Sequence, residues 1–232
     1  MAKLLYLSER TGSGPLDVAS PDGRGRLAAA LHEAGASRVQ VNVVDDEVAP
    51  AAGRRIESSG RPLRSMVSVW VDGDDPDAFE AIDRVIAGWD PEAASYLVEE
   101  ATPLAAPEVP PGHRQPGMAH IACFRRPEAQ PVDEWLELWK GSHTQIAIDT
   151  QDTFGYVQHV VVEVRTPGAT GWHAIVEECF PAAAMDDDHA FYDAVGDDER
   201  LARHRREMLA SVTRFIDLSS IDVVPTGRYD LG

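Results

Sequence analysis

Short apolar and polar segments alternate along the chain, and the pattern predicts strands separated by amphipathic helices. In the first hundred residues, apolar and β-branched runs of strand length occupy residues 3–7, 38–44, 66–71 and 95–99. A helix is expected around residues 25–34. A second helix is expected after Pro76, which suits a first helical turn and has Asp74 and Asp75 before it as candidate caps. The predicted order is β-α-β-β-α-β.

The second half of the chain repeats this order. Strands are expected at residues 118–124, 155–164, 172–180 and 221–224. One helix starts at Pro131, and another carries apolar residues in helical register from Leu201 to Ile216. The order is again β-α-β-β-α-β, the split βαβ pattern of the ferredoxin-like fold.

The two halves are separated by residues 101–117, which contain five prolines and little that could pack. We therefore expect a degenerate ferredoxin-like repeat at 1–100, a proline-rich linker at 101–117 and a second repeat at 118–232. A sheet with helices on one face leaves its other face bare, and packing two such faces together covers both. The expected fold class is α+β, with two tandem ferredoxin-like βαββαβ repeats packed as a single-chain dimeric α/β barrel.

Composition narrows the possible partners and the location. The 232 residues are 44% hydrophobic and carry a formal charge of −18, which disfavours phosphate backbones and anionic lipids. No nucleic acid and no membrane is expected as a partner. The first residues read as a strand rather than an export signal, and the only cysteines are Cys123 and Cys179. A cytoplasmic protein is expected, and a homodimer through exposed edge strands is the preferred assembly.

The most informative stretch runs from Trp135 to His159. Trp139 and His143 are four residues apart, so they share one face of a continuous helix. Burial beside apolar walls would keep the His143 imidazole neutral, and a neutral imidazole is an effective general base. Tyr156 and Gln158 alternate on the following strand and therefore share a face.

The pattern Trp-x-x-x-His, followed about a dozen residues later by Gly-Tyr-Val-Gln, resembles the signature of the EthD family. The resemblance covers residues 117–231, and 175–180 resembles that family's third strand. It implies His143, Tyr156 and Glu177 as catalytic residues, with Trp139 and Gln158 binding substrate. Relatives of this kind include cofactor-free polyketide cyclases, lactone isomerases, dehydratases and anthrone monooxygenases.

Other features add one candidate and remove several. His120 lies two residues from both Met118 and Ala122 on its predicted strand, so the three share a face. His120 could therefore line the same cavity. Metal-binding spacings such as His-Glu-x-x-His and Cys-x-x-Cys are absent from the sequence, as is a dinucleotide fingerprint. No cofactor and no metal is expected. Purely structural roles for the same residues stay open. His143 could form a hydrogen bond at the helix end, and Trp139 and Tyr156 could be core residues.

The function predicted from these observations is that of an EthD-like small-molecule enzyme. It would use a histidine as general acid or base, without cofactor, on an apolar carbonyl, enol or phenol substrate. The reaction would be of the cyclase, dehydratase or isomerase type. One alternative is a cofactor-free or haem-assisted oxidoreductase or monooxygenase on the same scaffold, and another is a non-catalytic binder of small ligands.

Overall fold

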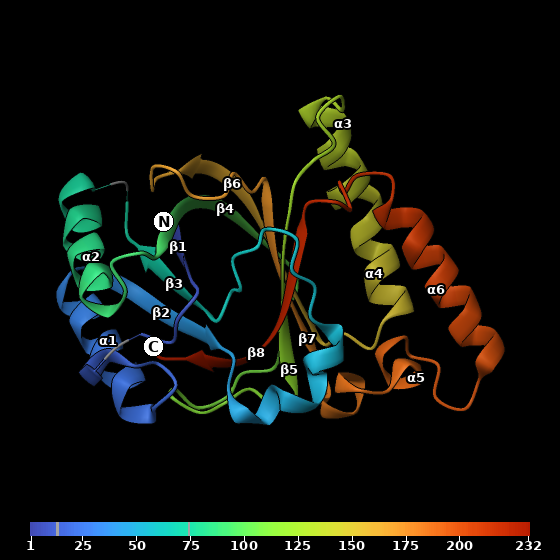
Figure 1. The fold of residues 1–232 in the computed structure, drawn as a ribbon, viewed down its shortest axis with the longest axis horizontal. Coiled ribbons are helices and arrows are strands. Elements are labelled where there is room, and N and C mark those ends of the chain that lie inside the picture. The colour runs from blue at the N-terminus through green and yellow to red at the C-terminus, as the bar shows by residue number, and fades with distance from the viewer. Residues whose placement is uncertain (13, 74) are drawn as a thin grey trace.

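A computed structural model describes residues 1–12, 14–73 and 75–232 and contains a closed barrel of eight antiparallel strands (Figure 1). Around the barrel the strands follow the order β1-β3-β2-β8-β5-β7-β6-β4. Their bounds are Ala2–Ser8 (β1), Ala36–Val43 (β2), Ser65–Val71 (β3), Ala94–Leu104 (β4), Met118–Phe124 (β5), Gly155–Val164 (β6), Ala174–Phe180 (β7) and Ile221–Asp230 (β8).

The expected fold class is wrong. The structure contains one closed eight-stranded sheet, not two tandem ferredoxin-like repeats whose sheets pack face to face as a dimeric α/β barrel. The first and second halves of the chain meet edge to edge, through antiparallel pairing of β2 with β8 and of β4 with β6. Separate sheets would leave rows of backbone N–H and C=O groups unpaired at their edges, and closure of the ring gives these groups partners.

Closure also affects the expected assembly. Each of the eight described strands has a neighbour on both sides, so the exposed edges that motivated a homodimer do not occur among them. The homodimer itself stays a prediction, as does the division of the chain at 101–117. Strand β4 continues to Leu104, so the first residues of the expected linker are part of the barrel wall.

Helices cover the outside of the barrel in two groups (Figure 1). The first group is α1 (Pro21–Glu33) and α2 (Pro76–Trp89). The second comprises α3 (Val132–Leu136), the π-helical turn η3 (Glu137–His143), α4 (Thr144–Thr150), α5 (Asp188–Phe191) and α6 (Asp198–Val212). Short 3₁₀ segments lie at Gly14–Leu16 (η1), Asp46–Arg54 (η2) and Ala182–Met185 (η4). No helix among the described residues is both long and apolar enough to span a bilayer.

Caps account for where the helices of the first group begin. The side chain of Ser20 accepts a hydrogen bond from the Gly23 N–H at the start of α1. Asp75 accepts one from the Asp77 N–H at the start of α2, as expected, whereas the other candidate cap, Asp74, lies outside the described residues. Proline occupies the first turn of both helices, where a missing N–H costs nothing.

The spaces between sheet and helices differ in the two halves. In the first half, apolar side chains from the outer faces of β1, β2 and β3 and from α1 and α2 form one filled core that includes Leu4, Leu27, Val69 and Ile82. In the second half, a smaller cluster around Phe124, Trp139 and Phe215 leaves a cavity. The barrel interior is apolar at one end, around Leu5 and Ile121, and polar at the other.

Candidate active site

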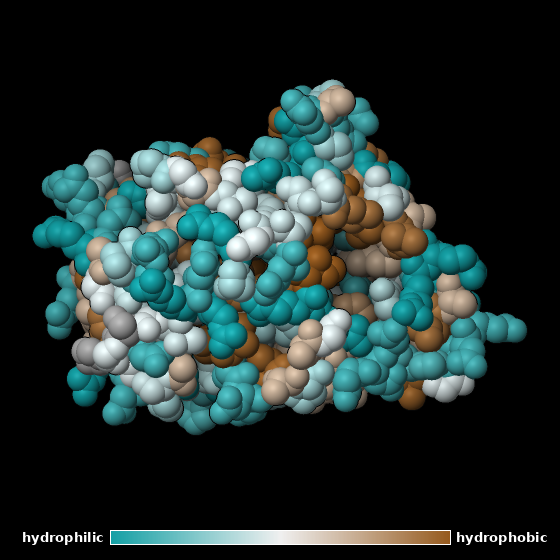
Figure 2. Space-filling model, viewed as in Figure 1, coloured by the Kyte–Doolittle hydropathy of each residue, from teal (hydrophilic) through white to brown (hydrophobic). Residues whose placement is uncertain are grey.

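The cavity of the second half lies between the outer face of the barrel and the segments η3, α5 and α6. Its volume is about 460 Å³. Most of its walls are apolar, including Val176, Met208, Val212, Phe215 and Ile216. Hydrophobic residues gather around a hollow between the barrel and helices α4 and α6 on the face shown in Figure 2. A chamber of this size and lining suits a small, largely apolar molecule.

Three polar residues form a row across the barrel wall of this cavity. Strand pairing places Glu178 of β7 directly opposite His120 of β5 on one side and opposite Tyr156 of β6 on the other. All three side chains line the cavity. Neither the His120 Nε2 atom nor the Glu178 Oε1 atom, both buried, has a hydrogen-bond partner among the described residues. Such unpaired buried groups are uncommon, and a ligand in the cavity could supply the missing bonds.

Burial sets the charge of this row. Desolvation raises the pKa of Glu178 to about 8 and lowers that of His120 to about 4. Desolvation, assisted by the nearby Glu178 carboxyl, also raises the pKa of the Tyr156 phenol. At neutral pH the row therefore presents a carboxylic acid, a neutral imidazole and a phenol, without net charge.

His143 enters the cavity from the helix side. It is the last residue of η3, and its Nδ1 atom lies 3.0 Å from the Ser211 Oγ atom of α6. The ring also lies 4.7 Å from that of Phe215, between centroids. Desolvation, with a smaller contribution from Arg214, lowers the pKa of His143 to about 4. The imidazole is therefore neutral and is held through Nδ1, whereas Nε2 makes no hydrogen bond within the described part of the chain.

The structure brings together four of the six residues singled out from the sequence. His120, Trp139, His143 and Tyr156 all line the cavity. Gln158 lies behind them, where its side-chain amide donates to the Thr144 hydroxyl at 2.8 Å.

Glu177 lies on the other face of the sheet. It faces the barrel interior, where its carboxylate accepts from the Gln40 amide at 2.7 Å and lies 3.1 Å from the Arg228 Nε atom. Adjacent strand residues point to opposite faces, so the acidic residue of the cavity is Glu178, one position later. The strand alternation could have identified Glu178. It lies two residues from Val176 and therefore on the same outer face, whereas Ile175 and Glu177 face inward.

Gln151 was also missed by sequence reasoning. It lines the cavity, and its side-chain oxygen is buried without a hydrogen-bond partner in the described residues. Its position just after α4 carries no sequence signal that distinguishes it from other polar residues. No cluster of three His, Cys, Asp or Glu side chains that could hold a metal ion occurs among residues 1–12, 14–73 and 75–232.

Comparisons with known proteins place the fold but not the family. No family model and no curated protein matches the sequence. Among solved structures, an anthrone oxidase-like protein aligns with 100% of this chain and 93% of its own, with a TM-score of 0.59 and 14% identity. A proposed monooxygenase from Lactobacillus acidophilus NCFM aligns with 98% of this chain and 93% of its own, with a TM-score of 0.49 and 9% identity. At 14% identity, the first similarity establishes a shared fold.

Proposed function

We propose that this protein is a small-molecule oxidoreductase that oxidises an apolar, enolisable or phenolic carbonyl compound in the cavity between the barrel and the segments η3, α5 and α6. The observation that carries the proposal is the row His120–Glu178–Tyr156 on the wall of a largely apolar chamber, in which His120 Nε2 and Glu178 Oε1 have no hydrogen-bond partner among the described residues. The oxidase activity after which the similar structure is named fits a substrate of this kind.

The two walls of the cavity provide complementary groups. The neutral Glu178 carboxyl and the Tyr156 hydroxyl are donors that would hydrogen-bond the oxygen of a substrate carbonyl as it becomes an enolate. His143, neutral and facing them from the helices, would accept the proton that leaves the adjacent carbon. An electron-rich enolate reacts with dioxygen, and conversion of its CH₂ group to C=O by one O₂ releases one water.

A second function uses the same proton transfers without oxygen. A facing acid and base, both uncharged, also suit the predicted cyclisation, dehydration or isomerisation by the EthD-like route, with His143 as general acid or base. In a non-catalytic binder of small ligands, we would expect His143 to point to solvent. His143 is instead buried at 5% exposure and lines the cavity, which favours catalysis over simple binding.

Oxygen consumption with anthrone as probe substrate tests the proposal. The protein should consume oxygen above the uncatalysed rate and form anthraquinone, detected by its absorbance. His143→Ala should lower the rate by about a hundredfold or more, the usual contribution of a general base. His113→Ala, which removes an exposed histidine remote from the cavity, should leave the rate unchanged.

Three results would contradict the proposal. An unchanged rate in both His143→Ala and Glu178→Gln would refute the assigned chemistry. Conversion of an enolisable substrate without oxygen consumption would favour the isomerase or cyclase type. A visible absorption band in the purified protein would point to the haem-assisted alternative.

A further inference from the structure

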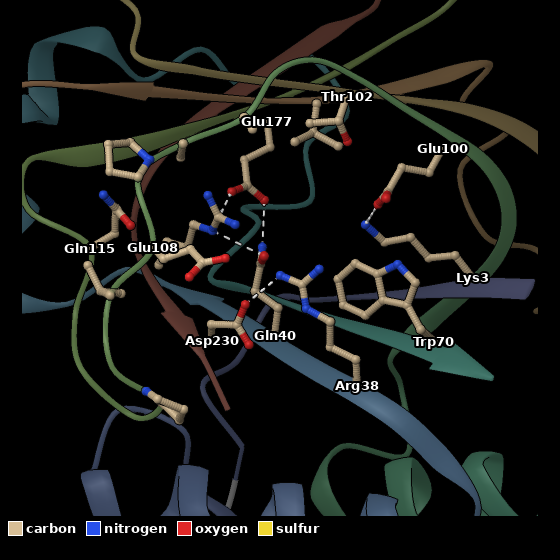
Figure 3. Close-up of a pocket in the computed structure, with 17 residues that line it drawn as sticks. Lys3, Arg38, Gln40, Trp70, Glu100, Thr102, Glu108, Gln115, Glu177 and Asp230 are labelled. Carbon is tan, nitrogen blue, oxygen red and sulfur yellow. Dashed lines mark hydrogen bonds and ion pairs between the residues drawn. The ribbon is translucent and has the colours of Figure 1, made fainter. Parts of the chain in front are cut away.

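A second cavity, of about 470 Å³, lies inside the barrel, on the opposite face of the sheet from the candidate active site (Figure 3). Strands of both halves form it, and residues 105–109 cross one side. Its lining is rich in charge, with Glu177 on one side and the paired Lys3 and Glu100 on the other (Figure 3). Arg228, which also lines the cavity, is paired with Glu177. The exposed Glu108 also lines it, so the cavity reaches solvent.

Lys3 is the distinctive residue of this cavity. The chain has 21 basic residues other than histidine, and only Lys3 and Lys140 are lysines. Lys140 is exposed, whereas Lys3 is 4% exposed and its amine lies 4.0 Å from the ring centre of Trp70. An arginine can form an ion pair but is not a useful nucleophile, whereas a buried lysine can become a neutral amine that attacks a carbonyl.

The Lys3 amine directs its hydrogens at two acceptors, Glu100 and His159. Its Nζ atom donates to Glu100 and lies 2.7 Å from the Nε2 atom of His159. The other ring nitrogen of His159 lies 2.9 Å from the Ile175 carbonyl oxygen, which can only accept. Nδ1 therefore carries the proton, and Nε2 accepts a hydrogen bond from the amine.

Burial opposes the effect of these contacts and favours the neutral amine. Desolvation lowers the pKa of Lys3 to about 8, although Glu100 opposes the shift. The charged and titratable groups that face the amine are Glu100, Glu177, Arg38 and His159.

We propose that the barrel interior is a second reactive site, at which Lys3 forms an imine with a small aldehyde. The ammonium releases one proton to solvent, and the nitrogen lone pair forms a bond to the carbonyl carbon as the C=O π bond breaks. One proton passes from nitrogen to the former carbonyl oxygen to give a carbinolamine. Its hydroxyl group and the remaining hydrogen on nitrogen then leave as one water, and the C=N bond of the neutral imine is left. Glu100 and His159 are positioning residues for the amine. The polar lining favours a hydrophilic aldehyde, unlike the apolar ligand of the first cavity.

Reductive labelling with propanal and cyanoborohydride tests this site directly. The reagent supplies hydride to the imine and fixes it as a propyl amine, and fragmentation mass spectrometry separates Lys3, Lys140 and the terminal amine. At pH 8, Lys3 should react at least about tenfold faster than Lys140 despite its burial, because an ordinary lysine is almost wholly protonated there. In denaturant the two rates should become similar. Equal rates in the folded protein, or a faster Lys140, would overturn the proposal.

Two variants separate reactivity from a structural role. Lys3→Arg keeps a cation beside Glu100 and should lose the label at position 3 alone. Glu100→Gln removes the carboxylate that stabilises the ammonium, so the pH profile of Lys3 labelling should move to lower pH. An unmoved profile, or one moved to higher pH, would contradict the assigned role of Glu100. The labelling ratio of the unaltered protein decides the proposal even if a variant fails to fold.

Discussion

The protonated state of Glu178 can be tested through stability alone, before any substrate is known. Burial raises the pKa of this carboxyl from 4.5 to about 8 in the folded protein, whereas the unfolded chain exposes it to water. Between these values the folded state binds one proton more than the unfolded state. The contribution of Glu178 is therefore fully present below pH 4.5, and stability is lost as the pH rises toward 8.

The size of the effect follows from the same two values. Each pH unit inside the interval costs about 1.4 kcal/mol. The buried histidines His120 and His143, whose pKa values are lowered from 6.5 to about 4, change stability in the opposite direction but only below about pH 6.5. Lys3 acts mainly above pH 8. Between pH 6.5 and 8, titration of Glu178 is therefore separated from that of these histidines and of Lys3. Over this range it should reduce the free energy of unfolding by about 2 kcal/mol.

Urea unfolding at four pH values between 6.5 and 8 would measure this difference. Glu178→Gln replaces the acid with a neutral group of similar shape, so the variant should gain about 2 kcal/mol relative to the unaltered protein across that range. Glu163→Gln, at an exposed position of β6, provides the control and should follow the unaltered protein. If the free energy of unfolding of Glu178→Gln also changes with pH in parallel with that of the unaltered protein, the Glu178 carboxyl is ionised in the folded state. It then cannot act as a neutral donor.

Three further changes test the site and the packing around it. Ser211→Ala removes the hydroxyl that holds the His143 ring, so kcat in steady-state kinetics should fall about tenfold with little change in KM. An unchanged kcat would show that packing alone holds the ring. Ala122→Leu places a larger side chain in the wall of the 460 Å³ cavity, so binding of anthraquinone, followed by tryptophan fluorescence, should weaken while the melting temperature changes little. Ile82→Ala truncates a fully buried residue of the filled first-half core and should cost about 2 to 5 kcal/mol in urea unfolding, and a loss below 1 kcal/mol would mean that this core is looser than the structure shows.

The sequence predicted most strand positions because strand propensity and alternation are local properties. Expected residues 118–124 coincide with β5, and expected residues 155–164 coincide with β6. The expected final strand, 221–224, stops six residues short, because Pro225 and Gly227 are ordinarily strand breakers. At Gly227 the reason is a long-range contact, since a Cβ atom there would lie 2.0 Å from the Asp45 carboxylate and would displace that side chain.

Closure of the barrel could not be read from the same local pattern. Two four-stranded sheets and one eight-stranded ring bury similar apolar residues, and they differ in which strand edges meet. That choice depends on pairs far apart in sequence, such as Val41 with Tyr229 and Val98 with Val161. The candidate site was predicted where a local motif marked it, at Trp139, His143 and Tyr156. It was missed at Glu178, where one residue of strand register decides the face.

Strand β7 explains how one barrel can hold two chemically different chambers. Glu177 points inward, where it forms an ion pair with Arg228 and accepts a hydrogen bond from the Gln40 amide. Glu178 points outward, where it forms no ion pair within the described residues and burial raises its pKa to about 8. The difference between these two glutamates therefore comes from the face on which each side chain lies and not from the residue type. Because their partners do not overlap, a change at Glu178 should alter chemistry in the apolar cavity without altering imine formation at Lys3. In the Glu178→Gln variant, Lys3 should therefore be labelled at the same rate as in the unaltered protein. A large change in that rate would mean that the sheet couples the two chambers.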